Sequence, residues 1–85
     1  MGRSRRSQPL RLAKKLQTIR VGWLRLSQTE MAKALDLTVH YTAVSHFELG
    51  TREPSLMVLL KYARLAGISM EVLIDDNLDL PTSRR

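Results

Sequence analysis

Apolar residues recur at helical spacing along most of this chain, and no segment of useful length alternates strictly between apolar and polar residues. Between residues 9 and 21, Leu12, Leu16 and Ile19 fall at positions i, i+4 and i+7, on one face of a helix. Strands are disfavoured because a half-buried strand needs a two-residue period. The pattern predicts an all-α chain whose first helix ends at Gly22, since glycine commonly follows a helix.

A capping box begins the next helix. In the run Ser27-Gln28-Thr29-Glu30, the Ser27 hydroxyl can accept a hydrogen bond from the Glu30 amide. The Glu30 carboxylate can accept one from the Ser27 amide in return. We therefore expect a second helix to start at Ser27.

Further start and stop signals predict three more helices. One is expected over residues 41–49 with Gly50 as its stop, one from Ser55 to Gly67, and a short one after Ser69. Together with the first two, they predict a compact five-helix domain. The expected core consists of inward-facing apolar residues: Leu12, Leu16, Ile19, Met31, Ala32, Leu35, Val44, Phe47, Leu56, Leu59, Leu60, Ala63, Met70, Leu73 and Ile74.

Charge is distributed unevenly along the chain. Fourteen Lys and Arg against eight Asp and Glu give a net charge of +6 over 85 residues. Residues 1–25 contain no acid, and residues 71–79 contain no base. A basic small domain favours nucleic acid as its partner, or an anionic membrane surface; a merely solubilising charge is the alternative. We expect Arg11, Lys14 and Lys15 to lie off the apolar face, with the acidic segment at the opposite end of the molecule.

The composition argues against several other classes of protein. There is no cysteine, so neither a disulfide framework nor a thiolate zinc site is expected. Neither His40 nor His46 has carboxylates at a metal-ligand spacing, so we expect no metal and no cofactor. No apolar run reaches the roughly 20 residues that span a bilayer, and the basic start lacks the apolar stretch of a signal peptide, so a cytoplasmic protein is expected.

An enzyme is not expected either. Ser27, Ser45 and Ser55 are better explained as helix caps or surface groups than as nucleophiles, and no G-x-S-x-G context surrounds them. So small a core also leaves little room for a catalytic pocket.

Two longer segments carry a family resemblance. Leu26–Leu37 reads LSQTEMAKALDL, and Thr42–Ile74 reads TAVSHFELGTREPSLMVLLKYARLAGISMEVLI. They resemble the lambda-repressor-like helix-turn-helix family of the Cro/Xre type, with its L-S-Q-x-E-[LM]-A and [IV]-S-x-[IFLWY]-E-x-G patterns. The resemblance covers about residues 10–76. It implies a helix-turn-helix domain over residues 10–76, and the composition predicts a basic arm over residues 1–9 and a polar tail over 77–85.

The same resemblance implies a function. A small prokaryotic or phage transcriptional regulator, a repressor, would bind double-stranded DNA sequence-specifically by inserting the helix over residues 41–49 into the major groove. The chain departs from the family pattern in two places. Arg25 stands where a glycine with positive φ is common, and we expect Gly22 to supply that conformation one turn earlier. The turn before residue 41 is also longer than the family spacing, which leaves open which of Val39, His40 and Tyr41 faces DNA.

The resemblance assigns two sets of DNA contacts. Base readout falls to Tyr41, Thr42, Ser45 and His46, because the last three share one polar stripe opposite Val44 and Phe47. An ordinary solvated helix face is the alternative interpretation of that stripe. Contacts to the DNA backbone are expected from Gln28, Thr29, Lys33, Thr51, Arg52 and Arg25.

Arg20 and Glu48 receive a structural role by the same resemblance. We expect a partly buried ion pair that fixes the helix over residues 41–49 against the first helix.

A homodimer is expected, at least on DNA, because one such domain reads only a few base pairs. The apolar and acidic end over residues 70–80 is the expected dimer surface. Trp23 is either a second exposed apolar anchor or a cover over the end of the first helix.

The rival hypothesis is a protein-interaction module, such as the antitoxin of a toxin–antitoxin pair, whose chain beyond Asp75 would become ordered on a protein partner. An RNA-binding or membrane-surface peptide is a weaker alternative, and we expect no membrane partner.

Overall fold

The computed structural model describes residues 9–35 and 40–81, and within these ranges the chain is helical, with no strand. The predicted all-α class is confirmed. Expectations for the arm before residue 9, for Val39 and for residues 82–85 lie outside the described residues. The helical segments are α1 (Leu12–Gln17), η1 (Thr18–Leu24), α2 (Gln28–Ala34), α3 (Tyr41–Leu49), α4 (Leu56–Ala66) and α5 (Met70–Ile74).

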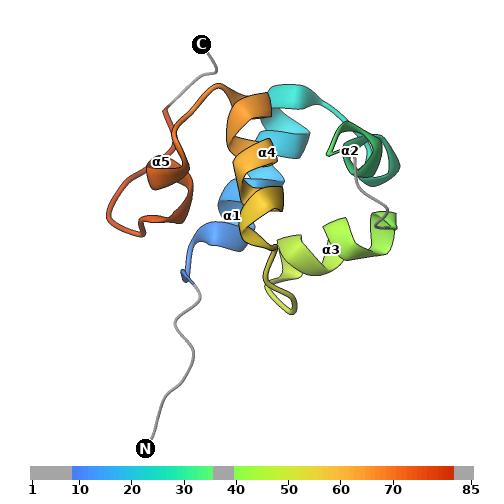
Figure 1. The fold of residues 1–85 in the computed structure, drawn as a ribbon, viewed down its shortest axis with the longest axis horizontal. Helices are drawn as coiled ribbons and strands as arrows, with labels where there is room; N and C mark the ends of the chain where they lie inside the picture. Colours follow the sequence, from blue (N-terminus) through green and yellow to red (C-terminus); the bar gives the residue numbers. More distant parts are fainter. Residues whose placement is uncertain (1–8, 36–39, 82–85) are drawn as a thin grey trace, which may run out of the picture.

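The helices pack in two groups around α1. On one side α3 contacts both α1 and α2, and on the other α5 contacts both α1 and α4 (Figure 1). The π-helical segment η1 continues α1 and contacts α4. As a result, α2 and α3 form one unit held on the rest of the domain by α1.

Most of the expected core is buried. Leu60 and Met70 are only partly buried. Leu56 is 70% exposed and Ile74 is 39% exposed, so placing these two in the core was wrong. Leu56 is the first residue of α4, and the inward face of that helix is formed instead by later residues. The buried apolar residues are Leu12, Leu16, Ile19, Met31, Ala32, Leu35, Ala43, Val44, Phe47, Val58, Leu59, Tyr62, Ala63, Ala66 and Leu73.

The first helical stretch runs past Gly22. It passes from α1 into η1 and ends only at Arg25, whose φ of 55° and ψ of 45° lie in the left-handed region. The N–H groups of Arg25 and Leu26 both donate to the carbonyl of Arg20, the second at 3.0 Å. The bond from Arg25 to Arg20 spans five residues, as in a π-helix, and it carries the helix past Gly22. The expectations that Gly22 ends the helix and supplies the positive φ are therefore wrong; Arg25 adopts that conformation itself.

The predicted start signals act as expected. The Glu30 N–H donates to Ser27 Oγ at 3.0 Å, and the Ser27 N–H donates to Glu30 Oε1 at 2.8 Å, which confirms the capping box. Ser55 and Ser69 accept backbone N–H groups at the starts of α4 and α5, each at 3.3 Å. These caps set where α2, α4 and α5 begin.

Candidate nucleic-acid interface

The helix α3 has a buried face and an exposed face. Val44 and Phe47 are buried against α1 and α2, whereas Thr42 and His46 are exposed and Ser45 is half-buried. The stripe predicted from the spacing therefore faces away from the core. It offers hydroxyl and imidazole groups, which can donate to or accept from base edges.

The start of α3 is also open to solvent. His40 precedes the helix in an extended conformation, its side chain makes no capping hydrogen bond, and it is exposed. Tyr41, the first residue of α3, is exposed as well. Of the three residues left open by the long turn, His40 and Tyr41 lie on the surface beside the stripe, and Val39 lies outside the described residues.

The loop after α3 is fastened to the end of that helix. The N–H and the hydroxyl of Thr51 both donate to the carbonyl of His46, at 3.1 and 3.3 Å. The Arg52 guanidinium carbon lies 5.9 Å from the centroid of the Phe47 ring, a distance at which a cation is attracted to the ring face. Both loop side chains are exposed, so the loop presents a hydroxyl and a cation at a fixed place beside α3.

The other expected backbone contacts lie on or before α2. Gln28 and Thr29 occupy its first turn, half-buried and exposed respectively, and Lys33 is exposed in its last turn. Arg25 is exposed in the connection between η1 and α2. Since α2 packs on α3, the groups of α2 lie in the same unit as the stripe on α3.

An ion pair fixes α3 to the first helical stretch. Arg20 donates through Nε to Glu48 Oε2 at 2.6 Å and through its Nη2 atom to Glu48 Oε1 at 2.9 Å. The side chains are 13% and 4% exposed. A third bond, from Arg20 Nη1 to the carbonyl of Leu26 at 2.9 Å, engages the remaining nitrogen of the guanidinium. The structure thus places the two residues of the predicted pair in bidentate contact, and the hydrogen bond to Glu48 raises the pKa of Arg20.

Tyr62 lies beside this pair. Its side chain is fully buried, and among the described residues its hydroxyl has no hydrogen-bond partner. Burial raises the pKa of Tyr62, with the charge of Glu48 adding to the effect. The tyrosine therefore stays neutral and acts as an apolar core residue that carries one unsatisfied polar atom.

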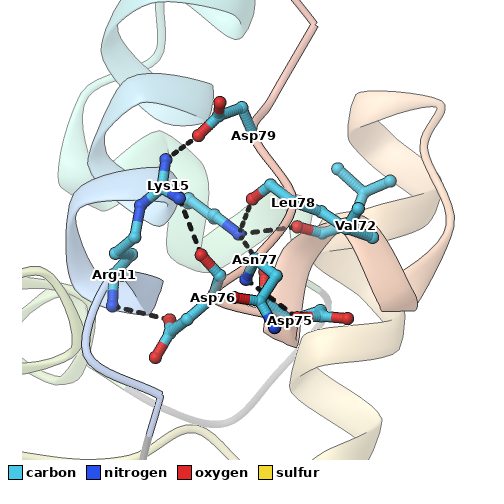
Figure 2. A network of polar contacts seen from close by, with 8 residues as sticks. All are labelled: Arg11, Lys15, Val72, Asp75, Asp76, Asn77, Leu78 and Asp79. Atoms are coloured by element: carbon cyan, nitrogen blue, oxygen red, sulfur yellow. Dashed lines mark hydrogen bonds and ion pairs between the residues drawn. The ribbon is translucent and has the colours of Figure 1, made fainter.

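The acidic segment that follows α5 packs against the basic start of α1 (Figure 2). Lys15 is only 4% exposed, and its ammonium donates to the carbonyls of Val72, Asp75 and Leu78 at 2.8, 2.9 and 2.7 Å. Burial lowers the pKa of Lys15. The expectation that this lysine lies off the buried face was wrong, because three backbone carbonyls after and within α5 replace its water.

Asp76 caps α1 from the other end of the chain. The N–H groups of Leu10 and Arg11 donate to its two carboxylate oxygens, at 2.8 and 3.0 Å. The Arg11 guanidinium pairs with Asp79 and donates to the carbonyl of Asp76 at 2.7 Å (Figure 2). These bonds lower the pKa of both carboxyl groups. The acidic segment therefore does not lie opposite the basic one, and that expectation was wrong.

Sequence reasoning missed these contacts, although one signal was present. Lys15 stands three residues after Leu12 and four before Ile19, which puts it on the buried stripe of α1. The packed chain also continues beyond residue 76, since Leu80 packs against the core. Trp23 is half-buried and packs there too, so it covers the end of the first helical stretch.

The described residues hold no cluster of three or more His, Cys, Asp or Glu that could bind a metal. None of their helices is both long and apolar enough to cross a membrane.

A family model described as helix-turn-helix matches residues 16–73, from near the end of α1 to Leu73 in α5. No curated protein and no solved structure gives a significant match. The match includes α2, α3 and the loop after α3, the elements that carry the exposed stripe.

Proposed function

Since the chain belongs to the lambda-repressor-like helix-turn-helix family, whose members bind DNA as transcription regulators, we propose that it binds a specific duplex sequence by inserting α3 into the major groove. The observation that carries the proposal is the polar stripe of Thr42, Ser45 and His46, opposite the buried Val44 and Phe47. An α-helix fits the major groove, where each base pair presents its own pattern of donors and acceptors. Tyr41 stands at the start of the stripe and extends it.

The backbone contacts surround this stripe. Thr51 and Arg52 in the loop after α3 would hold one strand, and Arg25 and Lys33 would hold the region next to α2. Gln28 and Thr29, in the first turn of α2, would add hydrogen bonds to phosphate oxygens. Such contacts fix the register of α3 and carry most of the salt-dependent affinity.

The ion pair of Arg20 and Glu48 sets the angle at which α3 meets the groove. Three hydrogen bonds hold the arginine between η1 and α3, so the helix cannot rotate without breaking them. We assign the pair a positioning role and no contact with bases.

Repression by a homodimer is the expected mode of action in the cytoplasm. A single reading helix covers only a few base pairs, so two copies on a two-fold-related site would supply the affinity. A bound dimer then excludes other proteins from the same DNA. Within residues 70–80, the predicted dimer surface, Asp76 and Asp79 are engaged with α1, which leaves α5, with its exposed Glu71 and Ile74, as the part open to a second copy.

The rival assignment is a protein-interaction module of the antitoxin kind. It predicts that the chain beyond Asp75 becomes ordered only when a protein partner binds. Asp75, Leu78 and Asp79 already bond to Lys15 and Arg11 within the single chain, so this feature does not favour the rival.

Salt dependence and two substitutions test the proposal. Binding of duplex DNA, selected from a random pool and measured by fluorescence anisotropy, should weaken with salt by a log–log slope of about 0.9 per neutralised phosphate. His46→Ala should change the selected sequence, whereas Arg52→Ala should lower the affinity for all sequences alike. Arg64→Ala, which removes an exposed arginine of α4, is the matched control and should change neither the selected sequence nor the affinity. An affinity that does not change with salt would refute DNA binding. If His46→Ala and Arg52→Ala both lower the affinity equally for all sequences, base readout by the stripe on α3 is refuted.

A further inference from the structure

A groove of about 410 Å³ lies between the first helical stretch and the segment that follows α5. One wall comes from α1 and η1, and the other from the chain that returns along them after Asp76. Apolar and cationic side chains share the lining: Leu10, Trp23, Leu80 and Pro81 are apolar, and Arg11 and Lys14 are cationic. Its volume is that of a site for a small molecule.

The apolar walls are held in place. Trp23 and Leu80 are half-buried and pack against the core, so their exposed surfaces have a fixed separation. Leu10, at the rim, is 90% exposed. An apolar body in the groove would remove surface of all three side chains from water, and such burial is favourable.

The electrostatics of the groove favour an anion. Arg11 is already paired with Asp79, and the Lys15 ammonium beneath the groove is satisfied by three carbonyls. Lys14 is exposed, and within the described residues its ammonium has no hydrogen bond or ion pair. The lining thus holds three cations and one carboxylate, a net charge of about +2, and Lys14 is a cation that is open to solvent next to the apolar walls.

We propose that this groove binds a small amphipathic carboxylate, with its apolar body against Trp23 and Leu80 and its carboxylate paired with Lys14. Such a ligand bridges two segments from opposite ends of the chain and therefore tightens the packing of the C-terminal segment on α1. The groove lies on the α5 side of α1, whereas α2 and α3 lie on the other side (Figure 1). The site is thus separate from the stripe on α3, and the proposal does not depend on DNA binding.

The intrinsic fluorescence of the chain reports on this site directly. Trp23 is the sole tryptophan of the sequence, so a ligand that covers it changes the emission. Titration of the full chain with octanoate, without DNA, should give a saturable change in emission. Octan-1-ol, which has the same chain length and no charge, should bind about tenfold more weakly, the factor that corresponds to one charge-assisted hydrogen bond.

Two substitutions locate the carboxylate. Lys14→Gln should weaken octanoate binding about tenfold and leave octan-1-ol unaffected, because it removes one charge-assisted contact. Arg64→Gln, which removes an exposed cation of α4 outside the groove, should change neither affinity. Both side chains are exposed, so neither variant should lose its fold.

Three results would overturn the proposal. The first is a lack of saturable binding at millimolar octanoate, and the second is equal affinity for octanoate and octan-1-ol. The third is octanoate binding that Lys14→Gln leaves unchanged. Because all arms are measured without DNA, their failure leaves the DNA-binding proposal standing, and loss of DNA binding leaves this one standing.

Discussion

In the connection between η1 and α2, the backbone of Arg25 favours glycine, whereas the proposed DNA contact needs its side chain. Its backbone lies in the left-handed region, with φ 55° and ψ 45°, which glycine adopts freely and a residue with a Cβ does not. Its side chain is exposed and, under the proposed function, contacts a DNA phosphate. We predict that Arg25→Gly stabilises the fold and weakens DNA binding at the same time.

The magnitudes follow from that geometry. The left-handed conformation costs an L residue about 1–2 kcal/mol, which the substitution removes. The greater freedom of glycine in the unfolded chain offsets about 0.5–1 kcal/mol of this gain. A net gain of about 0.5–1 kcal/mol raises the Tm of a domain of this size by about 2–8 °C. Loss of one phosphate contact should lower the log–log salt slope by about 0.9.

Thermal unfolding followed by circular dichroism measures the first effect, and anisotropy at several salt concentrations measures the second. Arg25→Ala is the matched control, since it removes the same charge but keeps a Cβ in the left-handed region. Its Tm should stay near that of the parent, and its salt slope should fall as in the glycine variant. A glycine variant no more stable than the alanine variant would refute the strain argument. An unchanged salt slope in both would remove Arg25 from the DNA backbone contacts.

Three further predictions concern the buried polar groups. Tyr62→Phe should raise the free energy of unfolding in urea by about 1 kcal/mol, because the buried hydroxyl has no partner among the described residues; a decrease would show that the hydroxyl is satisfied. Glu48→Ala should lower the free energy of unfolding by about 3 kcal/mol, because Arg20 would be left buried without the carboxylate of Glu48. An unchanged unfolding midpoint would contradict this. The backbone N–H groups of Leu10 and Arg11, just before α1, lower the pKa of Asp76. The contribution of Asp76 to stability is therefore present above about pH 4 and is lost as the pH falls through the lower folded-state pKa. Asp76→Asn should therefore make the acid limb of the stability–pH curve shallower in calorimetry, and an identical curve would count against the cap.

The features that could be predicted from the sequence are those that depend on neighbours a few residues away. The capping box at Ser27, the span of α3 and the stop at Gly50 each follow from side chains within one turn of the helix end. The exposed stripe on α3 was predictable for the same reason, because helical spacing alone separates His46 from Phe47.

The features that could not be predicted depend either on residues far away in the chain or on local helix geometry that leaves no pattern of side chains. Helical spacing places Lys15 on the buried stripe of α1, but its partners could not be predicted, because they are carbonyls 57 to 63 positions later and backbone carbonyls leave no mark in a side-chain pattern. Leu56 has the composition of a core residue, but its place at the first position of α4 turns it outward. The π-helical turns of η1 likewise have no spacing signature, so the end of the first helical stretch was placed too early, at Gly22.

The bonds between α1 and the acidic segment also impose an order on folding during synthesis. Lys15 leaves the ribosome long before Val72, Asp75 and Leu78, which supply all the acceptors that replace its water. These contacts can form only after the whole intervening chain has been made, and closing so long a loop also has an entropic cost. A nascent chain can therefore join α2 to α3 while the Lys15 ammonium is still hydrated, and α1 gains its Asp76 cap only when the end of the domain has emerged.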